Sequence, residues 1–185
     1  MVDPHQPGTS PLMALTLQQP NAWAVCHAGR DIENRRWRPP PFIANRRLAI
    51  HAGKAWGKSE KLAASTLACR LHPQLTVPLS PEGYVFGAVV AVARISGFID
   101  LDLDGDRGPF SFRARTTKGF AAIGGQLTEA QVEAALASPW WRGPCGWLLG
   151  DVQVLAQHVP LGGRQKLWSL PSDAALRVAA QVSII

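Results

Sequence analysis

Cysteine is scarce in this chain, and the few cysteines present exclude two kinds of small-protein scaffold. Three occur among 185 residues, at Cys26, Cys69 and Cys145, and they lie far apart in the sequence. An odd and widely spaced set provides neither a disulfide framework nor the Cys-x-x-Cys ligands of a structural zinc site. The histidines likewise lack the His-x-x-x-His spacing of a metal site. We therefore expect no metal centre in this protein.

Motifs for nucleotide cofactors and for common hydrolase nucleophiles are also missing. The sequence has no Gly-x-Ser-x-Gly elbow, no Walker loop and no Gly-x-Gly-x-x-Gly that opens a helix. The segment Asp100–Asp106 resembles the start of a calcium loop, but its twelfth position is Ser111, where a bidentate glutamate is required. No cofactor and no calcium ion is therefore predicted.

Long hydrophobic runs are absent as well. No stretch of about 18 apolar residues occurs, so no membrane-spanning helix is predicted. Residues 1–11 have neither the basic start nor the apolar stretch of a secretion signal. We expect a cytoplasmic protein in which residues 1–11 form a loose tail. Residues 12–185 are then long enough to form a single domain with its own core.

Positive charge is the most informative feature that is present. The chain has 19 Lys and Arg against 13 Asp and Glu, a formal net charge of +6. Residues 28–61 contain nine of these cations and three acidic residues, so this segment alone accounts for a surplus of +6. A local basic block in a folded domain indicates a polyanionic partner, although a solvated basic face without a partner has the same composition.

Hydrophobic periodicity predicts six or seven short strands with helices inserted between them. This order indicates an α+β fold, a small and partly open β-barrel with helices packed around it, rather than a doubly wound sheet. The expected strands are 13–17, 31–35, 47–52, 84–95, 110–115, 146–155 and 165–170. The expected helices are 21–28, 59–71, 128–138 and 172–180, with Ser59, Thr128 and Ser172 as N-caps.

Seven tryptophans are many for this length, and most are expected in the core. Trp147 and Trp168 lie in apolar strands and are predicted to be buried. Trp140 and Trp141 are adjacent in a loop, where burial of both is difficult, so one of them is a candidate for stacking on a base. Trp23 on the first helix is a further candidate.

The segment Arg30–Arg35 carries the best candidate for a functional carboxylate. A period of two places Glu33 and Arg35 on the same face of an extended segment. One interpretation is a structural ion pair. The other is a carboxylate that accepts hydrogen bonds from a base edge or activates a nucleophile, while the neighbouring arginines hold phosphate.

Three blocks of this sequence occur in the order found in a known domain family. They are 15–23 (LTLQQPNAW), 29–35 (GRDIENR) and 47–54 (RLAIHAGK), and segments 138–149 and 166–170 add to the likeness. Together they resemble the ASCH domain, whose signature is GxKxxExR and which is related to the PUA, EVE and YTH modules. Glu33 and Arg35 match the ExR of that signature, Arg30 stands at the lysine, and Ala28 stands at the first glycine. The resemblance covers roughly residues 13–170.

The resemblance implies a PUA-like barrel that handles RNA, with Arg30, Glu33 and Arg35 lining a cavity and Lys54 at its rim. Some ASCH proteins are amidohydrolases that act on an acetylated cytidine and use Lys, Thr and Glu. Here Arg30 and Glu33 stand at the first two of those positions, and arginine is a poor general base. Other members are ribonucleases, for which Glu33, His51 and Lys54 would serve as acid, base and phosphate clamp.

The sequence is therefore consistent with three hypotheses about function. The first is a nucleic-acid-binding module that holds RNA or another single-stranded nucleic acid in a basic cleft, with RNA favoured over DNA. The second is a hydrolase that uses the same cleft, with Glu33, His51 and Lys54 as catalytic residues. The third is a protein-interaction domain whose basic block meets an acidic surface. For the first hypothesis, the predicted contact residues are Trp23, Arg30, Glu33, Arg35, Arg36, Lys54, Trp140 and Trp141. The oligomeric state is left open.

Overall fold

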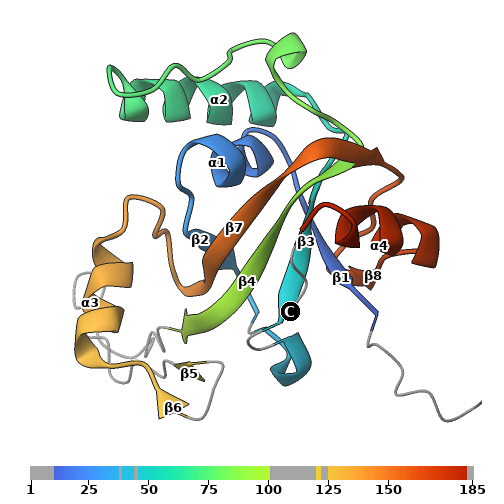
Figure 1. Cartoon of the computed structure of the whole chain (residues 1–185). Coiled ribbons are helices and arrows are strands. Elements are labelled where there is room, and N and C mark those ends of the chain that lie inside the picture. Colours follow the sequence, from blue (N-terminus) through green and yellow to red (C-terminus); the bar gives the residue numbers. More distant parts are fainter. Residues whose placement is uncertain (1–10, 38, 44–45, 101–119, 122–124, 183–185) are drawn as a thin grey trace, which may run out of the picture.

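The fold is α+β, as predicted: a curled mixed sheet forms half of a barrel, and four helices pack around it (Figure 1). The structure is a computed structural model of the whole chain, and it describes residues 11–37, 39–43, 46–100, 120–121 and 125–182. The strand predicted at 110–115 and nearly all of the expected tail at 1–11 lie outside the described residues.

Six strands form the continuous part of the sheet, in the order β2-β7-β4-β3-β1-β8. Neighbouring strands run antiparallel except β1 and β3, which are parallel. Two short strands, β5 and β6, extend the sheet beside the end of β4. The bounds are β1 (Met13–Leu17), β2 (Ile32–Arg35), β3 (Arg47–Ala52), β4 (Ala88–Asp100), β5 (Phe120–Ala121), β6 (Gly125–Gln126), β7 (Cys145–Pro160) and β8 (Leu167–Ser169).

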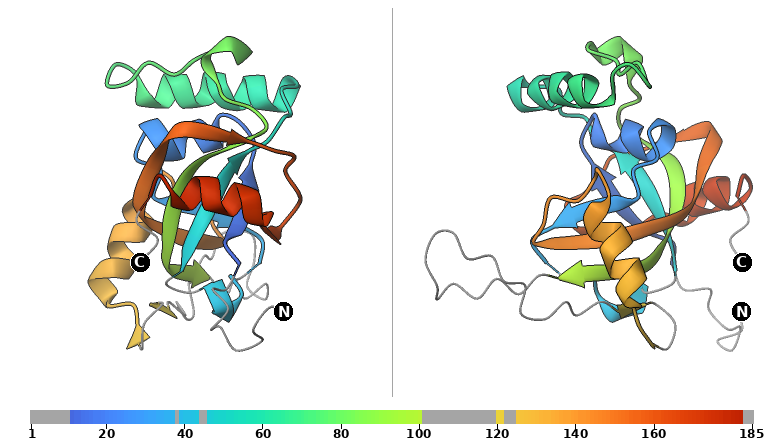
Figure 2. Two further views of the ribbon diagram at one scale, coloured as in Figure 1. Left: turned by 45° about the vertical axis from the view of Figure 1, so that its right-hand side comes forward. Right: turned by 90° about the vertical axis from the view of Figure 1, so that its left-hand side faces the viewer.

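The helices lie at different edges of this sheet. They are α1 (Asn21–His27), α2 (Lys58–Leu71), α3 (Glu129–Ala137) and α4 (Ser172–Ala179). Helices α1 and α2 stack over one end of the sheet, α3 lies beside the opposite end, and α4 lies near β8 (Figures 1 and 2). Among the described helices, none has the length and apolar character needed to cross a membrane.

The N-cap predicted from the sequence is the observed one for α3, but the predicted N-caps of α2 and α4 are not. Thr128 caps α3 as predicted: its hydroxyl accepts from the Gln131 amide at 3.3 Å, and the Gln131 side chain accepts from the Thr128 amide at 2.9 Å. Ser59 does not cap α2, because the helix already begins at Lys58. There the Gly57 amide donates to the Glu60 carboxylate at 2.8 Å, which satisfies one free N–H of the first turn. Ser172 is already helical and follows Pro171.

Buried side chains form three core clusters: one contains Trp147, one contains Trp168 and joins the sheet to α4, and one contains Trp140. Trp147 is 0% exposed and Trp168 is 6% exposed, which confirms their predicted burial. Strand β4 begins at Ala88 rather than at the predicted Tyr84. Tyr84 instead packs in an aromatic cluster, with its ring centroid 5.0 Å from that of Trp56. Gly87, at φ +61°, separates that cluster from the strand.

Backbone hydrogen bonds join the ends of several strands at one corner of the barrel. The Gly53 amide donates to the Leu17 carbonyl at 2.8 Å, and the Gly87 amide donates to the Ala52 carbonyl at 2.8 Å. The Leu161 amide in turn donates to the Gly87 carbonyl at 3.0 Å. These contacts bring the ends of β1 and β3 beside the loop that connects β7 to β8.

Candidate functional site

A cavity of about 660 Å³ opens at this corner of the barrel. Its wall includes the ends of β1, β2 and β3 and the loop 162–166. Four cationic side chains line it, and no carboxylate is among its described lining residues. The cations are Arg35, Lys54, Arg164 and Lys166, and the uncharged polar side chains are those of Thr16, Gln18 and Gln165. An anion is therefore the ligand that this wall favours.

Lys54 reaches the cavity because Gly87 leaves room for its side chain. A Cβ atom added at Gly87 would lie 2.6 Å from Lys54 Cε, so the lysine stem lies directly against the glycine backbone. The positive φ of Gly87 also favours glycine at this position. Lys54 itself is exposed, which leaves its ammonium group open to solvent and ligand.

Glu33 lies behind the cavity wall and is engaged by two arginines. Its Oε2 is 3.1 Å from Arg30 Nη2, and its Oε1 is 3.0 Å from Arg35 Nε. The Glu33 side chain is 7% exposed. Of the two sequence interpretations, the ion pair between Glu33 and Arg35 is the one that the structure contains. The carboxylate contacts both arginines and is largely closed to solvent in this arrangement.

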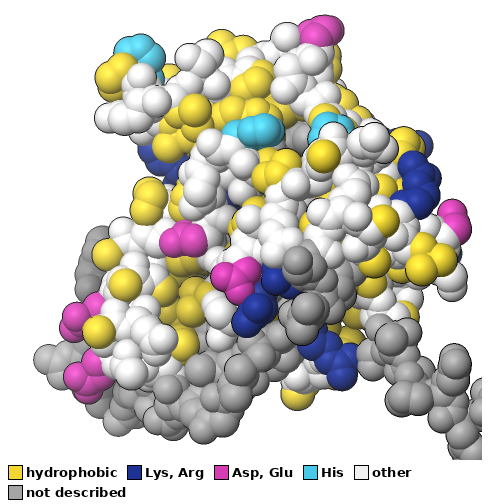
Figure 3. Space-filling view, in the orientation of Figure 1, with side chains coloured by type: hydrophobic (Ala, Val, Ile, Leu, Met, Phe, Trp, Pro, Cys, Tyr) yellow, Lys and Arg dark blue, Asp and Glu magenta, His cyan; other side chains and the backbone are white. Residues whose placement is uncertain are grey.

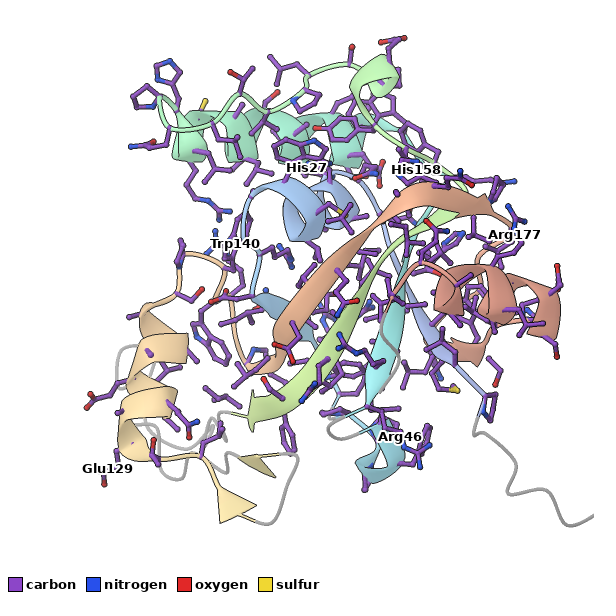
Figure 4. All side chains as sticks on the ribbon, viewed as in Figure 1. His27, Arg46, Glu129, Trp140, His158 and Arg177 are labelled. Atoms are coloured by element: carbon purple, nitrogen blue, oxygen red, sulfur yellow. The ribbon has the colours of Figure 1, made fainter. Side chains whose placement is uncertain are left out.

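The aromatic candidates are not brought to this cavity. Trp140 is 4% exposed, and its ring lies near two guanidinium groups, 5.5 Å from Arg30 Cζ and 4.5 Å from Arg70 Cζ. Figure 4 shows it on the segment between α3 and β7. Trp141 is half-buried against Gly146. Trp23, on α1, packs beside the ring of Tyr84. Of the predicted contact residues, only Arg35 and Lys54 line the cavity directly.

His51 forms part of the cavity floor and is fully buried. Its Nε2 lies 3.2 Å from the Leu161 carbonyl oxygen, and because a carbonyl only accepts, Nε2 carries the proton. Nδ1 has no hydrogen-bond partner among the described residues. Burial lowers the pKa of His51 below 6.5, and the nearby Lys54 charge acts in the same direction. The imidazole is thus neutral at pH 7, the state that a general base requires, and its Nδ1 is the nitrogen that could accept a proton.

We expect the buried neutral His51 to make stability fall with acidification. A lowered pKa in the folded chain means that the unfolded chain binds this proton first as pH decreases. The contribution is complete above pH 6.5, the ordinary value, and decreases as pH falls from there toward the lowered pKa. Melting temperatures between pH 8 and 5 should therefore fall more steeply for the wild type than for His51→Gln. The exposed His158→Gln variant is the control, and equal slopes for wild type and His51→Gln would contradict the assignment.

The predicted contact residues did not include the loop 162–166, which supplies two of the four cations. The signal was present as Gly-Gly-Arg-Gln-Lys, two glycines followed by two cations directly before the last strand. Lys166 has a positive φ of 59°, so the segment predicted as a strand from Gln165 begins its ladder only at Leu167. Gly163 packs on the imidazole so closely that an added Cβ would lie 2.4 Å from His51 Cε1.

Positive charge is dispersed on one face of the molecule. On the face shown in Figure 3, Lys and Arg occur in separate small groups, and acidic side chains lie near some of them. In the described part of the chain, Arg94 also pairs with an acidic residue, since its Nε lies 3.0 Å from Asp151 Oδ2. The cavity thus differs from that face by holding several cations without an acidic neighbour on its wall.

Comparison with known proteins gives a structural likeness only. No known family profile matches the chain, and no curated protein matches it. The fold is similar to a crystal structure of ASCH from Zymomonas mobilis, with 15% identity, a TM-score of 0.45, and coverage of 92% of this chain and 94% of that one. Two single-residue mutants of the same protein give TM-scores of 0.43 at 15% and 16% identity, and cover 92% of this chain and 98% of theirs. The domain named in these structures is the one that the motifs of this chain resemble.

Proposed function

We propose that this chain is a nucleic-acid-binding module that holds the phosphates of a single strand, RNA rather than DNA, in the cavity beside loop 162–166. The main support for this proposal is the composition of the cavity wall, which includes four cationic side chains and no carboxylate among its described residues. Gln18 and Gln165 on the same wall offer amide groups to ribose hydroxyls, which distinguish RNA from DNA. The Thr16 hydroxyl is already engaged, because it donates to the Arg164 carbonyl at 2.8 Å and accepts from the Trp168 indole at 3.2 Å.

Arg35 is the cation best prepared to bind a phosphate. Its Nε faces the Glu33 carboxylate at 3.0 Å, and its Nη2 lies 3.4 Å from the Thr16 carbonyl oxygen. No hydrogen bond to the described residues engages Nη1. The guanidinium plane is therefore fixed on one side while the other side can donate to a phosphate oxygen.

The hydrolase alternative is less well supported by this geometry. It requires Glu33, His51 and Lys54 to act on one scissile bond. Glu33 is buried between two guanidinium groups. His51 has the neutral state and the unpartnered Nδ1 that a base needs, but its side chain is fully buried. Only Lys54 of the three is exposed. The same binding samples should be analysed for cleavage products, and product formation would favour the hydrolase.

The test is a salt series of binding to a labelled octauridylate, with oligo-dT and duplex DNA as comparisons. Arg35→Gln and Lys54→Gln should each weaken binding about tenfold at low salt. Each should also reduce the slope of log K against log salt by about 0.7, the value for one lost phosphate contact on a single strand. Arg177→Gln on α4 removes the same charge away from the cavity and is the matched control (Figure 4). Equal weakening by all three variants would show that only net charge matters, and would contradict a site in this cavity.

A further inference from the structure

We propose that the chain holds a second nucleotide beside the first, in a separate cavity on the other side of Arg35. This inference rests on the proposed function and specifies its ligand as a strand of at least two consecutive nucleotides. The second cavity measures about 560 Å³, and its wall consists of Asn34–Trp37 together with Gly143 and Pro144. Arg35 belongs to the walls of both cavities, so the two cavities adjoin at this residue.

Charge continues from the first cavity into the second. Arg36 is exposed, lines the second cavity, and forms no ion pair with any described residue. No carboxylate is among the described residues of this wall either. Together with Arg35 and the cations of the first cavity, Arg36 extends one line of positive charge over two adjoining hollows. A mononucleotide would occupy one hollow, whereas a strand places successive phosphates along both.

The second cavity also has an indole on its wall, whereas the imidazole of His51 is the only aromatic ring among the described lining residues of the first. Trp37 is half-buried, and its ring packs edge-on against Trp147 with centroids 4.7 Å apart. The Trp147 indole N–H donates to the Trp37 carbonyl at 3.1 Å, which fixes the backbone there. An indole held in this way and still lining the cavity is suited to stack on a base, an interaction worth about 1–3 kcal/mol per base.

Asn34 stabilises the wall and does not read a base. Its amide nitrogen donates to the Trp140 carbonyl at 2.9 Å, and its amide oxygen accepts from the Arg142 amide at 2.8 Å. Both functions of the side chain are thereby used to hold the segment that leads to Gly143 and Pro144. With stacking and phosphate contacts as its means of recognition, the second subsite should be tolerant of base identity.

The experiment compares how well 5′-UMP and tetrauridylate displace a labelled octauridylate. With the wild type, tetrauridylate should compete at least about tenfold better than 5′-UMP. Arg36→Gln should weaken tetrauridylate about five- to tenfold and leave competition by 5′-UMP unchanged, whereas Arg35→Gln should weaken both. Trp37→Leu should weaken tetrauridylate by at least about fivefold, and Trp37→Phe, which keeps an aromatic face, should restore most of the affinity. Arg177→Gln is the charge control, and melting curves verify that each variant is folded.

Two results would overturn the second subsite while leaving the proposed function in place. One is equal competition by 5′-UMP and tetrauridylate. The other is an Arg36→Gln variant that weakens neither ligand, or weakens both to the same extent. Failure of the wild type to bind the octauridylate at all would instead overturn both proposals. The competition data therefore test the second subsite, and octauridylate binding by the wild type tests the proposed function.

Discussion

Replacing Glu33 with glutamine should lower the free energy of unfolding by about 3 kcal/mol. The substitution keeps the size of the side chain and removes its charge. Arg30 and Arg35, whose side chains are 10% and 23% exposed, would then lose the carboxylate that neutralises them. Removal of one partner from a buried ion pair typically costs about 3–5 kcal/mol. We expect the lower end because Arg35 keeps some contact with water.

A urea unfolding series gives this value, and Asp151→Asn provides a matched control on the same protein. Asp151 pairs with Arg94 at 3.0 Å, but its side chain is 56% exposed. An exposed pair of this kind contributes about 0–1 kcal/mol, so its loss should be small. If Glu33→Gln cost no more than Asp151→Asn, the carboxylate would not be the buried counter-ion that the geometry indicates.

The same variant separates a positioning role for Glu33 from base recognition. Without the carboxylate, the Arg35 guanidinium loses the contact that fixes its Nε edge. Affinity should then fall to a similar extent for oligonucleotides of every base composition, because the phosphate contact is the one disturbed. Binding of octauridylate and octaadenylate by Glu33→Gln tests this directly. A loss confined to one base would show that Glu33 reads that base.

Local sequence patterns predicted those strands and helices whose conformation depends on residues close together in the chain. The short apolar segments 13–17 and 47–52 gave β1 and β3, and Thr128 with Gln131 gave the start of α3. The shared face of Glu33 and Arg35 also followed from the strand period alone. These predictions held because the deciding residues lie within a few positions of one another.

The composition of the cavity could not be predicted in the same way. Arg164 and Lys166 lie more than 100 residues from Lys54 in the sequence. They reach the same wall because β8 pairs with β1, which pairs in turn with β3. The register of those strands depends on the whole sheet and not on the residues of the loop. The concentration of cations at 28–61 therefore indicated the charge of the partner but located only half of the cations that line the cavity.

Burial of Trp140 depended on partners equally distant in sequence. Two adjacent tryptophans in a loop made exposure of one of them a reasonable expectation. Arg30 and Arg70 instead pack on the ring, and the long apolar stems of arginine cover surface that water would otherwise contact. Neither arginine is near Trp140 in the sequence. Only the folded arrangement of β2, α2 and the segment before β7 brings the three side chains together.

Trp140→Ala should consequently act on stability first, lowering the free energy of unfolding by about 3–5 kcal/mol, the usual cost of deleting a buried aromatic side chain. The ring is 4% exposed and packs in a core cluster with Ile32 and Ile99, so its removal leaves a cavity. Urea unfolding of this variant gives the value. Trp140→Phe keeps an aromatic face for Arg30 and should cost less.

Binding by Trp140→Phe distinguishes this structural role from stacking on a base. The phenylalanine variant should bind octauridylate within about twofold of the wild type, because Trp140 lines neither cavity. Arg70→Gln removes the cation that lies 4.5 Å from the ring, and should cost about 0.5–1 kcal/mol without changing binding. A stable Trp140→Phe protein with strongly reduced affinity would mean that the indole contacts the ligand. In that case Arg30 and Arg70 would have to move away from the ring when nucleic acid binds.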